Sequence, residues 1–482
     1  MNIRTYSFSV LLVALLPFAV CSELDELVKE GQGINPSVQA AKYRMEQMLL
    51  KHEELSEFFD PSLFAALGRA DTARSLPLQT GYTSLTNNST ELQAGVEVPV
   101  EPGAYVSAGG AYRILEDEED YGDLHQTMFG VKVRIPLLRD RAFKDLTLKK
   151  AMAMAEYNAA TGAMLGATQA VRHTIELAYI SAYENLSSYR IAQEATKRFR
   201  NLHNEAIELS KMKVVPDFQT FQTKMDLQVG LEDEENARIK FEESLLVLAK
   251  AVGVTRNLAL QGNPEEMFAI RKVEDLQEVA NEAAFEARGE YIQCKANLQY
   301  ARTQVESAEE EQNDSLDLNF GITAQGEHET HPFGMEKLVT DRRVGGEVTL
   351  VWRRSLDYRG ANARKARYEA RIKEVQELLR EIEIGISNEI ASARLNYKAA
   401  MKRLELVSQG IEAAKQNLAA EQERFRLGET TSSIVTDAQK NLTTILRRQA
   451  SAAADLMRAR ANFNYATGYR EDSNTKETKV KE

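Results

Sequence analysis

The chain has 482 residues with a formal net charge of −12, and 43% of its residues are hydrophobic. This acidic balance argues against a nucleic-acid-binding protein, which needs a basic surface to meet phosphates. Two cysteines are too few for a disulfide scaffold or a cysteine-based zinc cluster. No apolar run beyond the N-terminus approaches the roughly 20 residues of a membrane-spanning helix.

Residues 1–21 have the pattern of a secretory signal peptide. Arg4 supplies the positive charge, and residues 10–20 form an apolar run of the length that such signals have. Ala19 and Cys21 place small residues at positions −3 and −1 relative to a cleavage point directly after Cys21. The alternative is that Cys21 is a lipidated N-terminus. Under both interpretations the chain is exported.

Long stretches without proline follow. Proline is absent between Pro136 and Pro216 and again after Pro332, and these gaps are rich in good helix formers. The expected helices cover residues 140–212, 217–252, 359–427 and 431–467. The two shorter helices end at Gly253 and Gly468, because helix caps favour glycine. Helices this long are not stable alone, so we expect them to pack lengthwise as coiled-coil-like hairpins.

Between these helices the period of the apolar residues changes from 3.6 to 2. The alternating segments cover residues 61–68, 91–100, 104–114, 128–137, 315–324 and 343–352. Segments of about ten alternating residues are typical of transmembrane β-barrel strands, which turn their apolar side chains toward lipid. A half-buried sheet in a soluble protein has the same alternation. The export signal and the lack of a spanning helix favour the barrel.

The connections between the strands predict an orientation. Residues 101–103 (Glu-Pro-Gly) form a tight turn, whereas residues 70–90, 115–126 and 325–342 have the composition of long polar loops. In outer-membrane barrels the short turns face the periplasm and the long loops face outside. The helices join the strand ends opposite the loops, so we expect them to extend into the periplasm.

The chain repeats one order of elements, which indicates an internal duplication. Each copy contains a helix, strands, a very long helix, a shorter helix and a closing glycine. The predicted segments are a signal peptide at 1–21, a first repeat at 22–256, a linker at 257–287, a second repeat at 288–468 and a polar tail at 469–482. Within the repeats, the barrel strands lie at 61–138 and 315–352, and the long helix pairs lie at 140–252 and 359–467.

In this order the elements resemble TolC-like outer membrane efflux proteins, the outer membrane factors, over residues 25–468. The resemblance is carried by Asn35 with Pro36, by Arg288 with Glu290, by residues 135–139 (IPLLR) and by residues 424–442 (RFRLGETTSSIVTDAQKNL). It implies an α+β membrane protein, in which a homotrimeric transmembrane β-barrel is continued by a long periplasmic barrel of α-helical coiled coils. It also implies a passive conduit across the outer membrane, which works with a periplasmic adaptor (membrane fusion) protein and an inner-membrane pump in efflux or type I secretion.

The resemblance further implies that two helix-turn-helix tips meet the adaptor and the pump. The predicted docking residues are Lys213, Val214, Val215 and Pro216 in the first tip, and Leu427, Gly428, Glu429 and Thr430 in the second. The first tip lacks the glycine that is usual in the family, so we expect Pro216 to supply the turn.

In the family, aspartates close the tapered end of the tunnel. The predicted constriction residues are Asp437, Asp217 and Ile434. Asp437 matches one of the two aspartate positions of the second tip, and Ile434 occupies the other. The alternative role for Asp437 is to cap its helix or to solvate it. The hairpin at residues 91–114 is additional to the family's usual two strands per repeat. With this hairpin a chain has six strands and a trimer 18, and without it a trimer has 12.

No catalytic motif is found, and we expect no enzyme activity, no cofactor and no metal site. The alternative function is a periplasmic coiled-coil adaptor or structural protein with a soluble β domain. An adaptor needs one helical hairpin and no lipid-facing strands, whereas this sequence predicts two hairpins and strands of spanning length.

Overall fold

The computed structural model describes residues 16–78, 81–117, 124–260, 262, 281–328 and 343–469. The chain divides into two compact units. The sheet unit comprises Glu46–Tyr157 and Ala296–Glu377, and the helical unit comprises the remaining three segments of the chain. Most of the predicted signal peptide, residues 1–15, lies outside the described residues.

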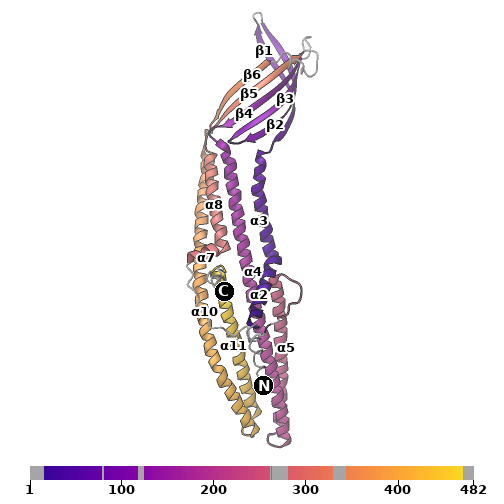
Figure 1. The fold of residues 1–482 in the computed structure, drawn as a ribbon, viewed down its shortest axis with the longest axis vertical. Coiled ribbons are helices and arrows are strands. Elements are labelled where there is room, and N and C mark those ends of the chain that lie inside the picture. The colour runs from indigo at the N-terminus through magenta and orange to yellow at the C-terminus, as the bar shows by residue number, and fades with distance from the viewer. Residues whose placement is uncertain are drawn as a thin grey trace, which may run out of the picture. The chain divides into compact units, whose positions relative to one another are not determined.

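The sheet unit contains one antiparallel sheet in which six strands pair in chain order (Figure 1). The strands are β1 (Ser62–Leu78), β2 (Gly81–Val100), β3 (Ala104–Asp117), β4 (Leu124–Pro136), β5 (Ser315–His328) and β6 (Arg343–Arg353). Each strand contains one of the segments in which the sequence alternates, so the predicted strands are confirmed. The hairpin of β2 and β3 brings the number of strands in the described sheet to six.

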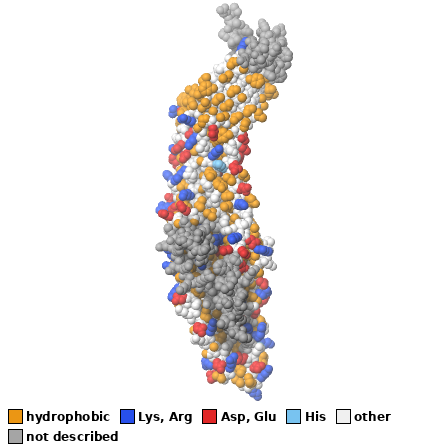
Figure 2. Space-filling model, in the orientation of Figure 1, with side chains coloured by type: hydrophobic (Ala, Val, Ile, Leu, Met, Phe, Trp, Pro, Cys, Tyr) orange, Lys and Arg blue, Asp and Glu red, His pale blue; other side chains and the backbone are white. Residues whose placement is uncertain are grey.

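The strand register collects the apolar residues on one face of the sheet. Val131 pairs with Ala108 on one side and with Ile322 on the other, and the same matching of apolar residues continues toward both edges. Successive side chains of a strand point to opposite faces, so the odd positions of β2 share the opposite, polar face. The side chains of the apolar face are exposed or half-buried, with exposure up to 86% for Leu63, and Figure 2 shows hydrophobic side chains gathered over the sheet.

One predicted loop is wrong. Residues 70–90 were expected to form a long polar loop, but β1 and β2 continue as a paired ribbon until Leu78 meets Gly81. Threonine and serine recur along both arms of this ribbon, and threonine fits a pleated strand well. Strands β3 and β5 also extend into the other two predicted loops, whose remaining parts, 118–123 and 329–342, lie outside the described residues.

All helical connections leave the sheet at one end. In the register, Ser62 pairs with Glu97 and Ser315 pairs with Arg353, so the helix-linked strand ends lie at the end that holds the 101–103 turn. A short helix, η2 (Arg141–Phe143), follows β4 there, and the buried Phe143 lies edge-to-face against Phe58, Phe59 and Tyr105. This aromatic cluster fixes the junction between strand and helix within the sheet unit.

Four helices account for most of the remaining chain, and their predicted extents are confirmed within a few residues. They are α4 (Lys144–Lys211), α5 (Phe218–Val252), α10 (Arg359–Arg426) and α11 (Ser432–Ala466), with 68, 35, 68 and 35 residues. Four shorter helices are α2 (Leu16–Ile34), α3 (Pro36–Glu54), α7 (Asn281–Ala287) and α8 (Gly289–Glu310). Gly253 and Gly468 follow the shorter members of the pairs with φ of +91° and +77°, as their glycine predicts. No helix in the described ranges combines spanning length with sufficient apolar character to cross a membrane.

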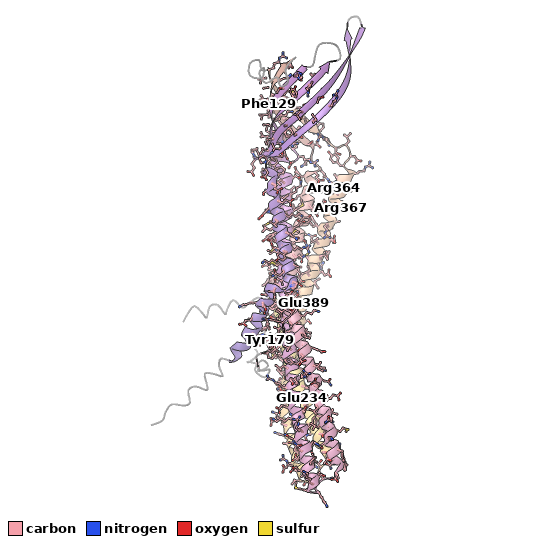
Figure 3. All side chains as sticks on the ribbon, turned by 90° about the vertical axis from the view of Figure 1, so that its right-hand side faces the viewer. Phe129, Tyr179, Glu234, Arg364, Arg367 and Glu389 are labelled. Atoms are coloured by element: carbon pink, nitrogen blue, oxygen red, sulfur yellow. The ribbon has the colours of Figure 1, made fainter. Side chains whose placement is uncertain are left out.

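The core of the helical unit surrounds two tyrosines of α4. Tyr179, labelled in Figure 3, and Tyr183 are buried against α2 and α5, and both hydroxyls donate to the carboxylate of Glu23 at 3.0 Å. Burial raises the pKa of both tyrosines, because it disfavours the phenolate. The two phenols therefore stay protonated and keep donating to Glu23.

Arg288 and Glu290, which carry part of the resemblance, form a second buried contact in this unit. The Arg288 side chain is 3% exposed and pairs with Glu290 at 2.6 Å and with Glu389 at 3.1 Å. Its guanidinium also lies 4.4 Å from the ring centroid of Tyr465. The ring of His173 stacks on the ring of Tyr465, with 4.5 Å between their centroids. Burial and the charge of Arg288 lower the pKa of His173.

Glycines allow α4 and α8 to approach very closely. A Cβ on Gly162 would lie 2.5 Å from the backbone nitrogen of Gln293, and a Cβ on Gly289 would lie 2.2 Å from the nitrogen of Gly166. These neighbours are backbone atoms, which cannot rotate away as a side chain can. The contact therefore requires glycine on both helices.

Candidate functional site at the helix tips

The first predicted tip is the turn between α4 and α5. Lys213 adopts a left-handed conformation, with φ of +57°. Its backbone N–H donates to the Ser210 carbonyl at 2.9 Å, and the N–H of Val214 donates to Leu209 at 2.9 Å. These bonds close the end of α4 in the manner usually supplied by glycine.

The expectation that Pro216 makes this turn is therefore wrong. Pro216 lies three residues after the left-handed residue, where its carbonyl accepts the N–H of Gln219 at 3.1 Å as α5 begins. Proline cannot adopt a positive φ, because its ring fixes φ near −65°. It instead lies directly before Asp217, the N-cap of α5, where the chain enters that helix.

The second tip, between α10 and α11, has the same geometry with the usual residue. Gly428 has φ of +76°, its N–H donates to Phe425 at 2.9 Å, and the N–H of Glu429 donates to Arg424 at 2.9 Å. Thr431 then adopts an extended conformation as the N-cap of α11. The predicted glycine turn is confirmed.

The two tips pack against each other within the helical unit. A Cβ on Gly428 would lie 3.2 Å from a methyl group of Val214, so the two turns are in contact. Beneath them, Val215 and the fully buried Phe425 belong to one apolar cluster, which contains side chains of α4, α10, α11 and the first turn. The other buried members are Leu202, Ala206, Leu209, Leu418, Val435, Ala438 and Leu442. The structure thus brings together the two sets of predicted docking residues.

A buried acidic residue, which the sequence analysis missed, joins the two hairpins just above the turns. Asp226 of α5 is 7% exposed and accepts a hydrogen bond from the hydroxyl of Thr436 at 3.1 Å. Lys440 completes the contact at 3.3 Å from the Asp226 carboxylate. A buried carboxylate needs such partners, because desolvation without them is costly. Arg426 and Glu205 form a further ion pair between the hairpins at 2.7 Å.

The predicted constriction residues are solvent-accessible in the single chain. Asp437 and Ile434 lie one turn apart on α11, and both are exposed, Ile434 by 46%. Asp217 is also exposed and accepts a hydrogen bond from the hydroxyl of Ser210. Thr431, and not Asp437, occupies the N-cap position of α11, so the capping alternative for Asp437 is excluded. Figure 2 shows acidic and basic side chains interspersed around this end of the helical unit.

An apolar stripe runs along the exposed side of α5. Phe218, Phe221, Met225 and Val229 follow one another at spacings of three and four residues, which places them on one helix face. All four are exposed in the single chain, Phe221 by 73%. An uncovered stripe of this size on a soluble helix marks a contact with another helix or another chain.

No protein-family model matches the sequence, and a search of curated proteins finds no similar sequence. The fold, in contrast, is that of solved outer-membrane channels. The outer membrane protein VceC from Vibrio cholerae is 15% identical with a TM-score of 0.65, over 93% of this chain and 96% of VceC. The CmeC outer membrane channel of Campylobacter jejuni is 13% identical with a TM-score of 0.63, over 95% of this chain and 88% of that one. The MtrE outer membrane channel of Neisseria gonorrhoeae, solved in an open state, is 14% identical with a TM-score of 0.66, over 92% and 88% of the two chains.

Proposed function

We propose that this chain, whose fold is that of outer-membrane channel proteins, is the outer-membrane conduit of a tripartite efflux or type I secretion system. The observation that carries the proposal is the six-stranded sheet, whose one face is apolar and exposed and whose one end joins the helices. The conduit is passive, and an inner-membrane pump supplies the energy. Its strands cross the outer membrane, and its helices extend into the periplasm.

The apolar face favours this function over that of a soluble adaptor. The strands have 11 to 20 residues, which is enough to cross a bilayer with the usual tilt. A sheet in a soluble protein covers its apolar face with another layer, whereas many large side chains of this face, such as Leu63, Val131 and Val348, are exposed in the sheet unit. Lipid is the environment that suits such a face.

The free edges of the sheet support assembly from several copies. Strands β1 and β6 each pair on one side only in the described sheet, and unpaired edges cannot be exposed to lipid. Closure by neighbouring chains satisfies both edges. With six strands from each chain, a homotrimer closes an 18-stranded barrel instead of one with 12 strands.

The helical unit supports the same assembly. The exposed stripe of Phe218, Phe221, Met225 and Val229 is suited to pack against a helix of a neighbouring copy. The equal lengths of α4 and α10, and of α5 and α11, support the proposed duplication into repeats at 22–256 and 288–468.

We assign contact with a periplasmic adaptor and with the pump to the two adjoining turns, Lys213 to Pro216 and Leu427 to Thr430. Among them, Lys213, Val214 and Leu427 are exposed and available for contact. Asp437 contributes to a constriction where copies of α11 converge. Carboxylates held close together there attract cations, because their repulsion is strong in a narrow opening of low dielectric constant.

The test is ion conduction by the purified full chain in planar lipid bilayers. We expect discrete channels that prefer cations, and we expect Asp437→Asn to reduce that preference while Asp437→Lys inverts it. The matched control is Glu234→Gln on α5, which removes the same charge farther from the tips (Figure 3). Absence of channels would refute the conduit. Unchanged selectivity in both Asp437 variants would refute the constriction and leave the conduit standing.

A further inference from the structure

A pocket of about 600 Å³ lies in the sheet unit, at the end of the sheet that joins the helices. Its floor is a row of polar-face side chains from neighbouring strands, where Tyr105 pairs with Arg134 in the register and Arg353 follows on β6. Arg364 of α10, labelled in Figure 3, lines the helical side. The volume falls in the range of small-molecule sites.

The lining of this pocket is basic, although the chain as a whole is acidic. Its charged residues are Arg134, Arg139, Arg353, Arg354 and Arg364, against Asp140, Glu311 and Asp317. The chain as a whole has a net charge of −12, so the lining differs in the sign of its charge from the rest of the molecule. The arginines are concentrated by the fold.

Two of the arginines are already neutralised. Arg364 forms an ion pair with Glu311, and Arg354 lies 3.9 Å from the carboxylate of Asp314. The side chains of Arg139 and Arg353, in contrast, have no hydrogen bond or ion pair with any residue in the described ranges. Both are exposed to the pocket and able to pair with a ligand.

A third guanidinium is held in position by an aromatic ring. That of Arg134 lies 4.1 Å from the ring centroid of Tyr105, an arrangement that restrains an arginine while leaving its N–H groups free to donate. The ring of Tyr105 is itself packed against Phe58 and Phe143. The position of Arg134 is therefore set before a ligand arrives.

One of the three acidic residues of the lining is directed toward the helix. The Asp140 carboxylate accepts the backbone N–H of Asp145 at 2.9 Å, at the start of α4. Burial raises the pKa of Asp140, because desolvation disfavours its charged form. Asp140 thus opposes a bound anion less than an exposed aspartate would.

We infer that this pocket binds an oxyanion, a carboxylate or a phosphate, of a small soluble molecule, through Arg134, Arg139 and Arg353. Guanidinium groups pair with carboxylate and phosphate oxygens through two parallel hydrogen bonds, which lysine cannot do. The pocket opens on the polar face of the sheet, away from the face suited to lipid, and this favours a soluble molecule over a phospholipid headgroup. In the conduit proposed above, the pocket meets anionic cargo at the entrance to the barrel. This role and the choice of a soluble molecule rest on that proposal, whereas the binding of an oxyanion does not.

The test is isothermal titration calorimetry of the purified full chain in detergent, with pyrophosphate and citrate as probes. We expect saturable binding that weakens as salt is added. Arg353→Gln and Arg139→Gln each weaken it by about tenfold, because a charge-assisted hydrogen bond contributes on that order. Arg353→Lys keeps the positive charge but cannot form two parallel hydrogen bonds, and we expect an intermediate affinity. The matched control is Arg343→Gln, on the same strand and face but paired with Glu327 at 3.3 Å near the other end, which leaves binding unchanged.

Circular dichroism and the elution volume establish that each variant is folded. The inference is overturned if the wild-type chain binds neither probe, or if Arg353→Gln and Arg343→Gln have the same affinity. Failure of the conduit has a different signature. If the chain conducts no ions but binds pyrophosphate, the proposed conduit fails and the anion-binding pocket stands. If the chain conducts ions but binds neither probe, the conduit stands and the anion-binding pocket is refuted.

Discussion

Arginine placed at Ala94 tests whether the apolar face of the sheet meets lipid. Ala94 lies on that face of β2 and the adjacent Gln93 on the polar face, and both side chains are exposed in the single chain. The register partners of Ala94 are Ala65 and Gly110, so a long side chain meets no bulky neighbour across the strands. Steric effects are therefore small at both positions, and the surrounding medium decides the outcome.

In water, a surface substitution of this kind changes the free energy of unfolding by no more than about 0.5 kcal/mol. On the lipid face near the bilayer midplane, an arginine costs about 2–4 kcal/mol. Since about 1.4 kcal/mol corresponds to a tenfold change in an equilibrium constant, Ala94→Arg should lower the ratio of folded to unfolded chains by about 30-fold or more. Gln93→Arg should change this ratio by about twofold at most.

The assay is urea unfolding of the chain refolded into lipid vesicles, with the folded fraction read from heat-modifiable migration on gels. The two variants differ only in the face that carries the new charge. If Ala94→Arg and Gln93→Arg lowered the free energy of unfolding by the same amount, lipid contact of this face would be refuted.

Three further predictions concern the helical unit. Gly162→Ala should destabilise it by about 1–3 kcal/mol in urea unfolding, because the new Cβ meets backbone atoms of α8. Gly410→Ala on α10, where a Cβ meets nothing within 4 Å, should stabilise it by about 1 kcal/mol. If Gly410→Ala destabilised the unit more than Gly162→Ala, the close packing of α4 and α8 would be refuted. Lys213→Gly should stabilise the first tip by about 1 kcal/mol in the same assay, since a left-handed conformation costs about that much in residues other than glycine, and Gly428→Ala should destabilise the second. Because the pKa of His173 is lowered by burial and by Arg288, the unfolded chain binds more protons and stability should fall as the pH drops below about 6.5. His173→Gln should lose less over that range, and identical pH profiles would count against the burial.

Local patterns in the sequence predicted much of the fold. Alternation located all six strands, because a strand with one apolar face repeats every two residues whatever lies beyond it. The two glycines that close the helix pairs, Gly253 and Gly468, gave the helix ends, since a left-handed cap excludes most other residues. The resemblance added the channel fold, which the solved structures confirm.

The features that could not be predicted depend on contacts between distant segments. Lys213 adopts a left-handed conformation that its residue type disfavours, and the packing of Val215 beneath the turn supports it. Asp226 looks like one more acidic residue on a charged helix, and only the approach of Thr436 and Lys440 makes it a buried anchor. The ribbon of β1 and β2 is missed because residues 70–90 show no regular alternation of apolar and polar types, so the sequence pattern does not distinguish it from a loop.

The glycine contact between α4 and α8 restricts how the helical unit can move. Sliding one helix along the other by a turn would bring a side chain to a place that has room only for hydrogen. The contact therefore acts as a fixed point for the two helices, because helices that cannot slide along each other can move only by rotating about the contact or by bending. Movement of the first tip relative to this contact then requires α4 to bend between Gly162 and its end at Lys211. Because α4 continues from Gly162 to Lys211, a small bend near the glycine contact produces a large displacement at the first tip.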